Sequence, residues 1–168
     1  MIVILMGVSG SGKTTIGQHL ARILNWRLLD ADDFHPAANI EKMSRGIPLE
    51  DSDRWPWLDR LNEMVRAEES SGENVLLACS ALKARYRDRL ARDCKDVRVV
   101  YLKGDFDLIE ARLMARKGHY MKAGLLKSQF AALEEPEGAV VMDIGGDPER
   151  IAARLLEALN LTPVNPGS

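Results

Sequence analysis

The sequence of 168 residues has few cysteines, no excess of one charge and no long hydrophobic run. Its two cysteines, Cys79 and Cys94, cannot build a disulfide framework and do not form a paired metal-ligand motif. We therefore expect reduced thiols and a cytoplasmic protein. The 23 basic and 25 acidic residues give a formal net charge of −2. This balance argues against a broad nucleic-acid-binding surface.

The hydrophobic segments are all short. The first, residues 2–6, stops at Gly7 and has no basic leader, so it predicts a strand and not a signal peptide. No segment approaches the roughly 20 apolar residues that span a bilayer, and we expect no membrane partner. No grouping of His, Cys and carboxylates suggests zinc. With 46% hydrophobic residues and no repeats, residues 1–168 are expected to fold as a single domain.

Residues 7–14 read Gly-Val-Ser-Gly-Ser-Gly-Lys-Thr, which is the G-x-x-x-x-G-K-T pattern of a phosphate-binding loop. An apolar run precedes the pattern, and Ile16, Leu20 and Leu24 follow it at helical spacing. The alternative is a Gly/Ser-rich turn that happens to precede a lysine. The order strand, glycine loop and helix favours the phosphate-binding loop, because that context is what a chance match lacks.

The residue types of this loop suit a nucleoside triphosphate. Glycines let backbone N–H groups approach phosphate oxygens, and the following helix directs its positive dipole end at the same anion. Lys13 is expected to reach the β- and γ-phosphates, and the Thr14 hydroxyl is a candidate Mg²⁺ ligand. The predicted ATP-contacting residues of the loop are Gly7, Ser9, Gly10, Ser11, Gly12, Lys13, Thr14 and Thr15.

Apolar runs and amphipathic segments alternate along the rest of the chain. Further strands are predicted at residues 26–29, 74–79, 97–102 and 139–142. Helices are predicted in the intervening segments: a short one after Pro36, a longer one from Asp53, one with Leu82 on its apolar side, one with Phe106, Ile109 and Leu113, and a last one before a frayed tail at 162–168. Such alternation predicts an α/β fold, a five-stranded parallel sheet with helices on both faces. Ligands bind at the carboxyl ends of strands in these sheets, where residues 7–14, 30–33, 79–83 and 104–105 would meet.

Two acids, Asp30 and Asp32, follow the second predicted strand. Phosphoryl transfer uses carboxylates to order Mg²⁺ or its waters and to orient the attacking hydroxyl. The competing interpretation is that loop acids cap the next helix, and we assign that role to Asp33. No other predicted strand end places an acid so close to a phosphate-binding loop, so we interpret Asp30 and Asp32 as functional.

Basic residues form two further clusters. Arg112 and Arg116 lie four apart on one helix face, before a basic, glycine-containing stretch that extends to residue 127. Spacing alone leaves two interpretations open, a mobile cover over the ATP phosphates and a solvated charged face. The second cluster consists of Lys83, Arg85, Arg87 and Arg89. Lys83 is nearest the predicted rim and is a candidate for binding an anionic substrate. Trp55 and Trp57 are interpreted as packing residues, and His35 as a ligand for a substrate hydroxyl or a cap of its turn.

These features together resemble the shikimate and nucleoside-monophosphate kinase superfamily, and most specifically the gluconokinase family. The segments that carry the resemblance, besides the phosphate-binding loop, are residues 30–36, 39–43, 46–58, 79–83 with Tyr86 and Arg87, 118–121 and 125–130. The resemblance implies a three-layer P-loop kinase fold with a mobile lid over residues 116–127. It also implies ATP- and Mg²⁺-dependent phosphorylation of the 6-hydroxyl of D-gluconate by a cytoplasmic homodimer. Tyr120 and residues 122–124 depart from the family pattern, in the lid only.

Gluconate is a polyol with one carboxylate, so its site should pair cations with polar side chains. We expect Asp32 to accept the 6-hydroxyl proton, Asp30 to order Mg²⁺ through water and Arg116 to meet the transferring phosphoryl group, with Arg112 behind it. The expected gluconate-binding residues are Asp32, His35, Arg54, Lys83 and Arg87. The alternatives are a related kinase of another small alcohol and, in a different class, a nucleotide-dependent switch. A GTPase-type switch would carry an Asn-Lys-x-Asp motif, which this sequence lacks.

Overall fold

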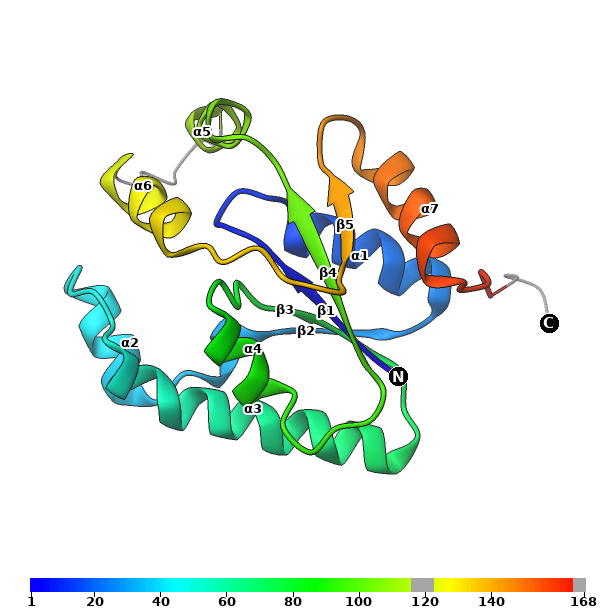
Figure 1. Cartoon of the computed structure of the whole chain (residues 1–168), viewed down its shortest axis with the longest axis horizontal. Helices are drawn as coiled ribbons and strands as arrows, with labels where there is room; N and C mark the ends of the chain where they lie inside the picture. The colour runs from blue at the N-terminus through cyan, green and yellow to red at the C-terminus, as the bar shows by residue number, and fades with distance from the viewer. Residues whose placement is uncertain (116–122, 165–168) are drawn as a thin grey trace.

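Five parallel strands form the sheet on which the other elements are arranged (Figure 1). The computed structural model describes residues 1–115 and 123–164. The strand order is β2-β3-β1-β4-β5, so that β1 is central, and Ile4 pairs in register with Leu77 on one side and Val99 on the other. The predicted five-stranded parallel sheet is therefore confirmed. The strands are β1 Ile2–Met6, β2 Arg27–Asp30, β3 Val75–Ala78, β4 Val97–Lys103 and β5 Val140–Asp143.

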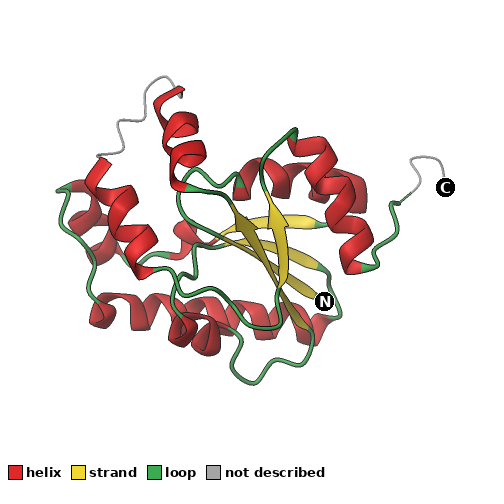
Figure 2. Cartoon of the chain, turned by 45° about the horizontal axis from the view of Figure 1, so that its top comes forward, coloured by secondary structure: helices red, strands yellow, loops and turns green. Residues whose placement is uncertain are grey.

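The helices cover both faces of this sheet, as predicted (Figure 2). Their bounds are α1 Lys13–Leu24, α2 Ala37–Ser44, α3 Asp51–Ser71, α4 Ala84–Leu90, α5 Phe106–Ala115, α6 Ala123–Ala132 and α7 Pro148–Leu159, with a 3₁₀ helix, η1, at Ala31–Phe34. Alternate β1 residues enter different cores because side chains along a strand point to opposite faces. Val3 and Leu5 pack in the core that contains α1, α5 and α7 residues, whereas Ile2 and Ile4 pack with α3 and α4.

The long helix α3 shows how local sequence sets an element. It begins at Asp51, two residues before the predicted start, where Glu50 and Asp53 form a reciprocal capping box. Its apolar stripe includes Leu58 and Leu61, both fully buried. The helix ends at Ser71, and Gly72 after it has a φ of 76°, a left-handed conformation that glycine adopts without steric cost.

Four local points of the sequence analysis need correction or completion. Leu82 precedes α4, which begins at Ala84, and packs in the core on the opposite face of the sheet from Tyr86. The helix α6 was not predicted, because residues 123–127 were assigned to the basic cover, yet it buries Leu126 in the core. Of the predicted lid, residues 116–122 lie outside the described residues, and 123–127 begin α6. Residues 162–164 have no regular secondary structure, although the N–H of Val164 donates to the carbonyl of Ile23 at 3.0 Å.

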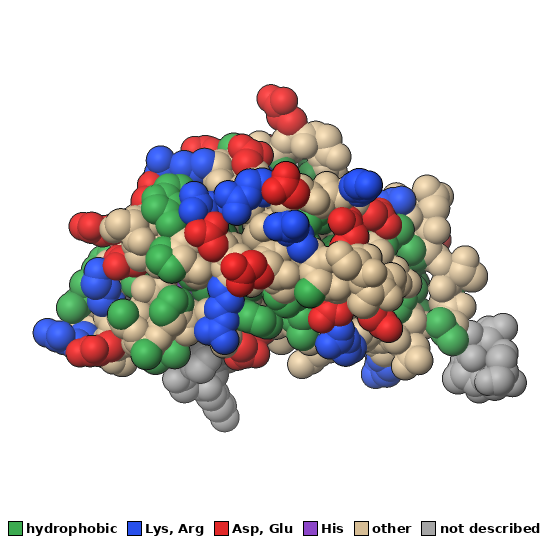
Figure 3. Space-filling model, turned by 90° about the horizontal axis from the view of Figure 1, so that it is seen from below, with side chains coloured by type: hydrophobic (Ala, Val, Ile, Leu, Met, Phe, Trp, Pro, Cys, Tyr) green, Lys and Arg blue, Asp and Glu red, His purple; other side chains and the backbone are tan. Residues whose placement is uncertain are grey.

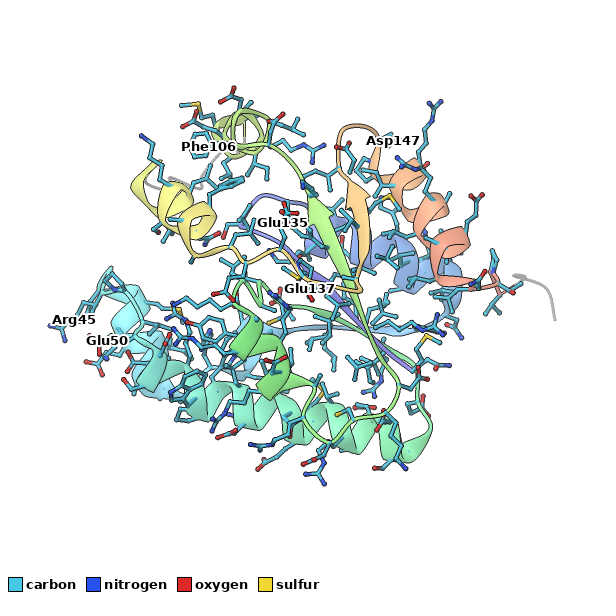
Figure 4. All side chains as sticks on the ribbon, viewed as in Figure 1. Arg45, Glu50, Phe106, Glu135, Glu137 and Asp147 are labelled. Carbon is cyan, nitrogen blue, oxygen red and sulfur yellow. The ribbon has the colours of Figure 1, made fainter. Side chains whose placement is uncertain are left out.

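The outer surface over α3 and α4 mixes basic and acidic side chains (Figure 3). The turn between α2 and α3, flanked by Arg45 and Glu50, stands at one end of the molecule (Figure 4). Among the helices that the structure describes, none combines the length and the apolar character that crossing a membrane requires.

Candidate active site

The carboxyl ends of the strands gather the predicted chemical groups at one edge of the sheet. The segment after β1 contains the phosphate-binding loop, β2 ends at Asp30, and β3 leads into Cys79 and Ser80. Backbone hydrogen bonds join two of these segments, since the N–H of Gly7 donates to Ser80 O at 3.3 Å. Helices α2, α5 and α6 stand beyond this edge (Figure 1). The predicted convergence of the rim segments is confirmed.

The phosphate-binding loop adopts a conformation that requires glycine. Gly10 and Gly12 have φ angles of 84° and 94°, in the left-handed region that other residues rarely adopt. A Cβ on Gly10 would also lie 2.8 Å from Cγ of Leu113, a side chain of α5. The loop therefore keeps an open backbone surface at the N-terminus of α1, where an anion interacts favourably with the helix dipole. This cradle fits a phosphate group.

Lys13 folds back across the loop. Its Nζ donates to Gly7 O at 3.0 Å and to Val8 O at 3.1 Å. Thr14, the next residue, is exposed in the first turn of α1. Ser11 is fully buried, and its N–H donates to Val8 O at 3.2 Å, so it shapes the loop from within. The Ser11 Oγ has no hydrogen-bond partner in the part of the chain that the structure describes.

Asp30 has a structural role that the sequence assigned to Asp33. The Oδ1 of Asp30 accepts the N–H of Asp32 at 3.0 Å and so caps η1. Asp33 lies inside η1, and the N-cap of α2 is Pro36 without a side-chain cap bond, so the prediction that Asp33 caps α2 is wrong. The physical reason is that an Asp side chain readily bonds the N–H two residues on, which makes the first acid of the group the cap. A carboxylate has further acceptor capacity, so Asp30 is still able to bind water.

Asp32, within η1, faces His35, the residue that directly follows η1. The Asp32 side chain is 85% exposed, and its Oδ1 lies 3.7 Å from His35 Nε2. The surrounding protein displaces part of its more distant hydration, and this desolvation, with the nearby charge of Asp30, raises the pKa of Asp32 above 3.8. A raised pKa brings a carboxylate closer to the range in which it can accept a proton effectively.

The tautomer of His35 follows from its surroundings. His35 is buried and stacks on Trp57 with ring centroids 4.3 Å apart, and burial lowers its pKa. Asn39 Nδ2 donates to His35 Nδ1 at 3.3 Å and to Asp53 O at 2.9 Å. Because an amide nitrogen donates only, Nδ1 must accept, and the neutral imidazole carries its proton on Nε2, on the side of Asp32.

Trp57 fixes the backbone between the two acids. Its Nε1–H donates to the carbonyl of Ala31 at 2.8 Å, and both residues are buried. Trp57 is a packing residue, as predicted, but its hydrogen bond gives it a second role. Sequence reasoning missed this role, since nothing in the spacing of Trp57 marks a bond to a residue 26 positions away.

A cation cluster surrounds Asp51 at the start of α3. Lys83 Nζ lies 3.7 Å and Arg54 Nη1 3.9 Å from Asp51 Oδ1, while Arg85 pairs with Oδ2 and the Tyr86 hydroxyl donates to Oδ1. The Tyr86 hydrogen bond and these cations lower the pKa of Asp51. Three cations against one carboxylate leave a net positive charge. Asp51 was not among the predicted site residues, because an acid in the first helical turn is typical of helices in general.

Besides Arg54, whose Nη1 donates to Leu49 O at 2.6 Å, two predicted arginines are bonded to backbone carbonyls. Arg87 Nη1 donates to Ala81 O at 2.9 Å and to Leu82 O at 3.2 Å, and burial lowers its pKa. Arg112 Nη2 donates to Ile144 O, beyond β5, at 2.6 Å. Both therefore stabilise loops at the rim in this structure. Arg116 lies outside the described residues.

Within residues 1–115 and 123–164, no group of three or more His, Cys, Asp or Glu side chains is arranged to hold a metal ion. Mg²⁺ does not need such a group in phosphoryl-transfer enzymes, because waters and substrate phosphates complete its shell around one or two protein ligands. The exposed Thr14 hydroxyl and Asp30 are oxygen donors of the kind it prefers.

Comparisons with known proteins agree with this geometry. A family model described as an AAA domain matches residues 2–136. The thermosensitive gluconokinase of Escherichia coli (strain K12) is 46% identical over 160 residues, which cover 93% of this chain and 86% of that protein. The crystal structure of a sugar kinase from Janibacter sp. HTCC2649 superposes with a TM-score of 0.88 at 43% identity, covering 96% and 95% of the two chains.

A gluconokinase structure from Sinorhizobium meliloti 1021 superposes with a TM-score of 0.81 at 39% identity, covering 94% of each chain. The resemblance that the sequence motifs indicated is thus confirmed along nearly the whole chain. This chain belongs to the gluconokinase family, within the P-loop kinases.

Proposed function

We propose that this protein transfers the γ-phosphoryl group of ATP to the 6-hydroxyl of D-gluconate, which yields 6-phosphogluconate and ADP. The observation that carries the proposal is a continuous set of contacts at the rim. Asp32 faces His35, His35 accepts from Asn39, and Asn39 donates to the carbonyl of Asp53, directly before Arg54. A candidate base and a candidate carboxylate-binding cation are thereby held in one connected framework.

On the nucleotide side, the loop of residues 7–15 would hold the ATP phosphates. Backbone N–H groups at the N-terminus of α1 supply donors, and Lys13 would exchange its carbonyl partners for phosphate oxygens. Charge that develops on the transferring group is stabilised by such preorganised donors. When bound, Mg²⁺ would neutralise phosphate charge, and we propose Thr14 as its ligand and Asp30 as a ligand through water.

On the gluconate side, Arg54 and Lys83 would bind the carboxylate. The net positive charge around Asp51 suits a substrate that carries a single negative charge. Asp51 and Tyr86 would hold the cations in place, because Arg54 and Lys83 both lie over the Tyr86 ring, at 5.6 and 5.5 Å from its centroid. Arg87 would act on this site through the carbonyls of Ala81 and Leu82, which flank the approach to Lys83.

The chemical step would use Asp32 as the base. The 6-hydroxyl oxygen attacks the γ-phosphorus, the bond from phosphorus to the ADP oxygen breaks, and the hydroxyl proton passes to Asp32. The Nε2–H of His35 faces the Asp32 carboxylate and would hold it, or a substrate hydroxyl beside it, in position. On sequence grounds Arg116 remains our prediction for the residue that meets the transferring phosphoryl group from a lid at 116–127, with Arg112 behind it.

A homodimer and a cytoplasmic location are further proposals, and kinship with gluconokinases is their support. A molar mass of about twice 18.7 kDa in light scattering after gel filtration would support the dimer. A monomeric mass at micromolar concentration would contradict it.

The proposed function is tested with a panel of acceptors. Purified protein, ATP and MgCl₂ are incubated with gluconate, shikimate or nucleoside monophosphates, and both ADP and the phosphorylated product are measured. Gluconate should give the highest kcat/KM, with 6-phosphogluconate as product, and chelation of Mg²⁺ should abolish turnover. Preference for another alcohol would replace the proposal with a related kinase activity, and slow acceptor-independent hydrolysis would favour a nucleotide-dependent switch.

A further inference from the structure

Gln129 of α6 makes two hydrogen bonds to Ser9 of the phosphate-binding loop, 120 residues away in the sequence. The N–H of Ser9 donates to Gln129 Oε1 at 2.7 Å, and Gln129 Nε2 donates to Ser9 Oγ at 3.0 Å. Because a backbone N–H can only donate, the first bond fixes which end of the amide is oxygen. Both functional ends of this one side chain are therefore engaged with one residue of the loop.

The segment that follows Gln129 is bound to the opposite side of the site. The N–H of Glu134 donates to Leu82 O at 2.8 Å, and Glu134 Oε2 accepts the N–H of Ala84 at 2.6 Å. These two bonds enclose Lys83, one of the proposed gluconate-binding cations. Residues 129–134 thus contact the ATP-binding loop at one end and the gluconate-binding segment at the other.

Neighbouring contacts hold this segment to the rest of the rim. Phe130 packs against Phe106 at the start of α5, with ring centroids 5.5 Å apart, and Glu135 pairs with Lys103 at the end of β4 at 2.6 Å. Figure 4 shows Phe106 near α6 and Glu135 on the segment that leads from α6 toward β5. With Leu126 buried in the core and Phe130 packed against Phe106, residues 126–130 of α6 have a defined position. Gln129 can therefore impose that position on Ser9.

We propose that Gln129 is a positioning residue for phosphoryl transfer: it ties the Ser9 end of the phosphate-binding loop to residues 129–134, and so fixes the spacing between the ATP-binding loop and the Lys83 segment. This inference rests on the proposed kinase activity. Transfer requires the phosphorus and the attacking oxygen in a narrow range of distance and angle, and a displacement of about 1 Å can cost roughly 10²-fold in rate.

A positioning role predicts a specific kinetic signature. We expect nucleotide affinity to come mainly from the N–H groups around Gly12 to Thr14 and from Lys13, and less from the contact between Ser9 and Gln129. The Gln129→Ala variant should therefore lose about 10- to 100-fold in kcat, with ADP and gluconate dissociation constants within about threefold of the wild type. Ser128→Ala is the matched control, since among the described residues the Ser128 Oγ bonds within α6, to Leu125 O at 2.8 Å, and its side chain is exposed.

Two more variants separate positioning from general damage to α6. Gln129→Glu keeps an acceptor for the Ser9 N–H, so it should recover part of the kcat that Gln129→Ala loses, while its charge raises the KM for ATP. Ser9→Ala removes one of the two bonds without altering α6. In a double-mutant cycle the effects of Ser9→Ala and Gln129→Ala on kcat should be less than additive, because both act through the same contact.

Hydrogen exchange gives a readout that does not depend on catalysis. In the protein without ligands, the Ser9 amide should exchange faster in Gln129→Ala than in the wild type or in Ser128→Ala. If the wild type phosphorylates another acceptor, the proposed substrate fails while this exchange result can still stand. The positioning role is overturned if Ser9 exchange is unchanged, if folded Gln129→Ala keeps kcat within twofold of the wild type, or if ADP affinity falls as much as kcat.

Discussion

Replacing Trp57 by Phe should disturb the acidic segment, residues 30–33, without removing any of its aspartates. The variant keeps an aromatic ring against His35 but removes the Nε1–H that Ala31 O accepts at 2.8 Å. Ala31 is 1% and Trp57 7% exposed, so water cannot readily replace the lost donor. A buried carbonyl left without a donor costs about 1–3 kcal/mol. In a domain of this size about 1 kcal/mol shifts Tm by roughly 2–4 °C, so we expect Tm to fall by roughly 2–12 °C.

The same change should lower turnover. Ala31 lies between Asp30 and Asp32, so a shift of its carbonyl moves both proposed functional acids. We expect kcat to fall by about tenfold or more, on the scale of misplaced reacting groups, while the KM for ATP stays near that of the wild type. Thermal unfolding by circular dichroism and a coupled ADP assay measure the two effects.

Trp55→Phe is the control for this prediction. Trp55 presents its ring edge-on to Tyr86, with centroids 5.8 Å apart, so the control removes the same atoms without breaking the Ala31 bond. It should have a smaller effect on Tm and leave kcat unchanged. Equal behaviour of the two variants would refute the reasoning, because it would show that the hydrogen bond does not position the acidic segment.

Three further predictions concern the ATP loop, the cation cluster and the base. Lys13→Ala should fold normally yet lose on the order of 10²–10³ in kcat, and near-normal turnover in steady-state kinetics would contradict the phosphate-loop assignment. Arg54→Ala should raise the KM for gluconate by about 10- to 150-fold, which corresponds to the loss of a charged hydrogen bond of about 1.5–3 kcal/mol. The control Arg60→Ala, on the same helix, should leave this KM unchanged. Equal losses of affinity for gluconate and ATP would mean that Arg54 has a structural role. Desolvation and the charge of Asp30 raise the pKa of Asp32, so its ionised, proton-accepting form is lost at a higher pH than that of an ordinary aspartate. A pH profile of kcat should therefore show an acid limb that Asp32→Asn removes along with the activity, and a profile without an acid limb would count against Asp32 as the base.

The sequence by itself determined the fold class and the nucleotide-binding loop. Both depend on short-range patterns: glycines at fixed spacing before Lys13, apolar runs of strand length, and helical periods between them. Parallel strands necessarily end at one edge of their sheet, so the alternation of elements also predicted that the phosphate-binding loop and Asp30 would meet. Periodicity did not reveal α6, because its first half, residues 123–127, belongs to the stretch that was interpreted as a cover.

Only the tertiary structure decided which partners the side chains of the site bond to. Asp30 rather than Asp33 became the cap, because the path of the backbone through η1 determines which carboxylate reaches an N–H. Asp51 gathers cations from α4 and from the segment before it, and Gln129 bonds to Ser9 across 120 residues. Such partners are distant in sequence and leave no local pattern, since their proximity exists only after the strands have paired and the helices have packed on both faces of the sheet.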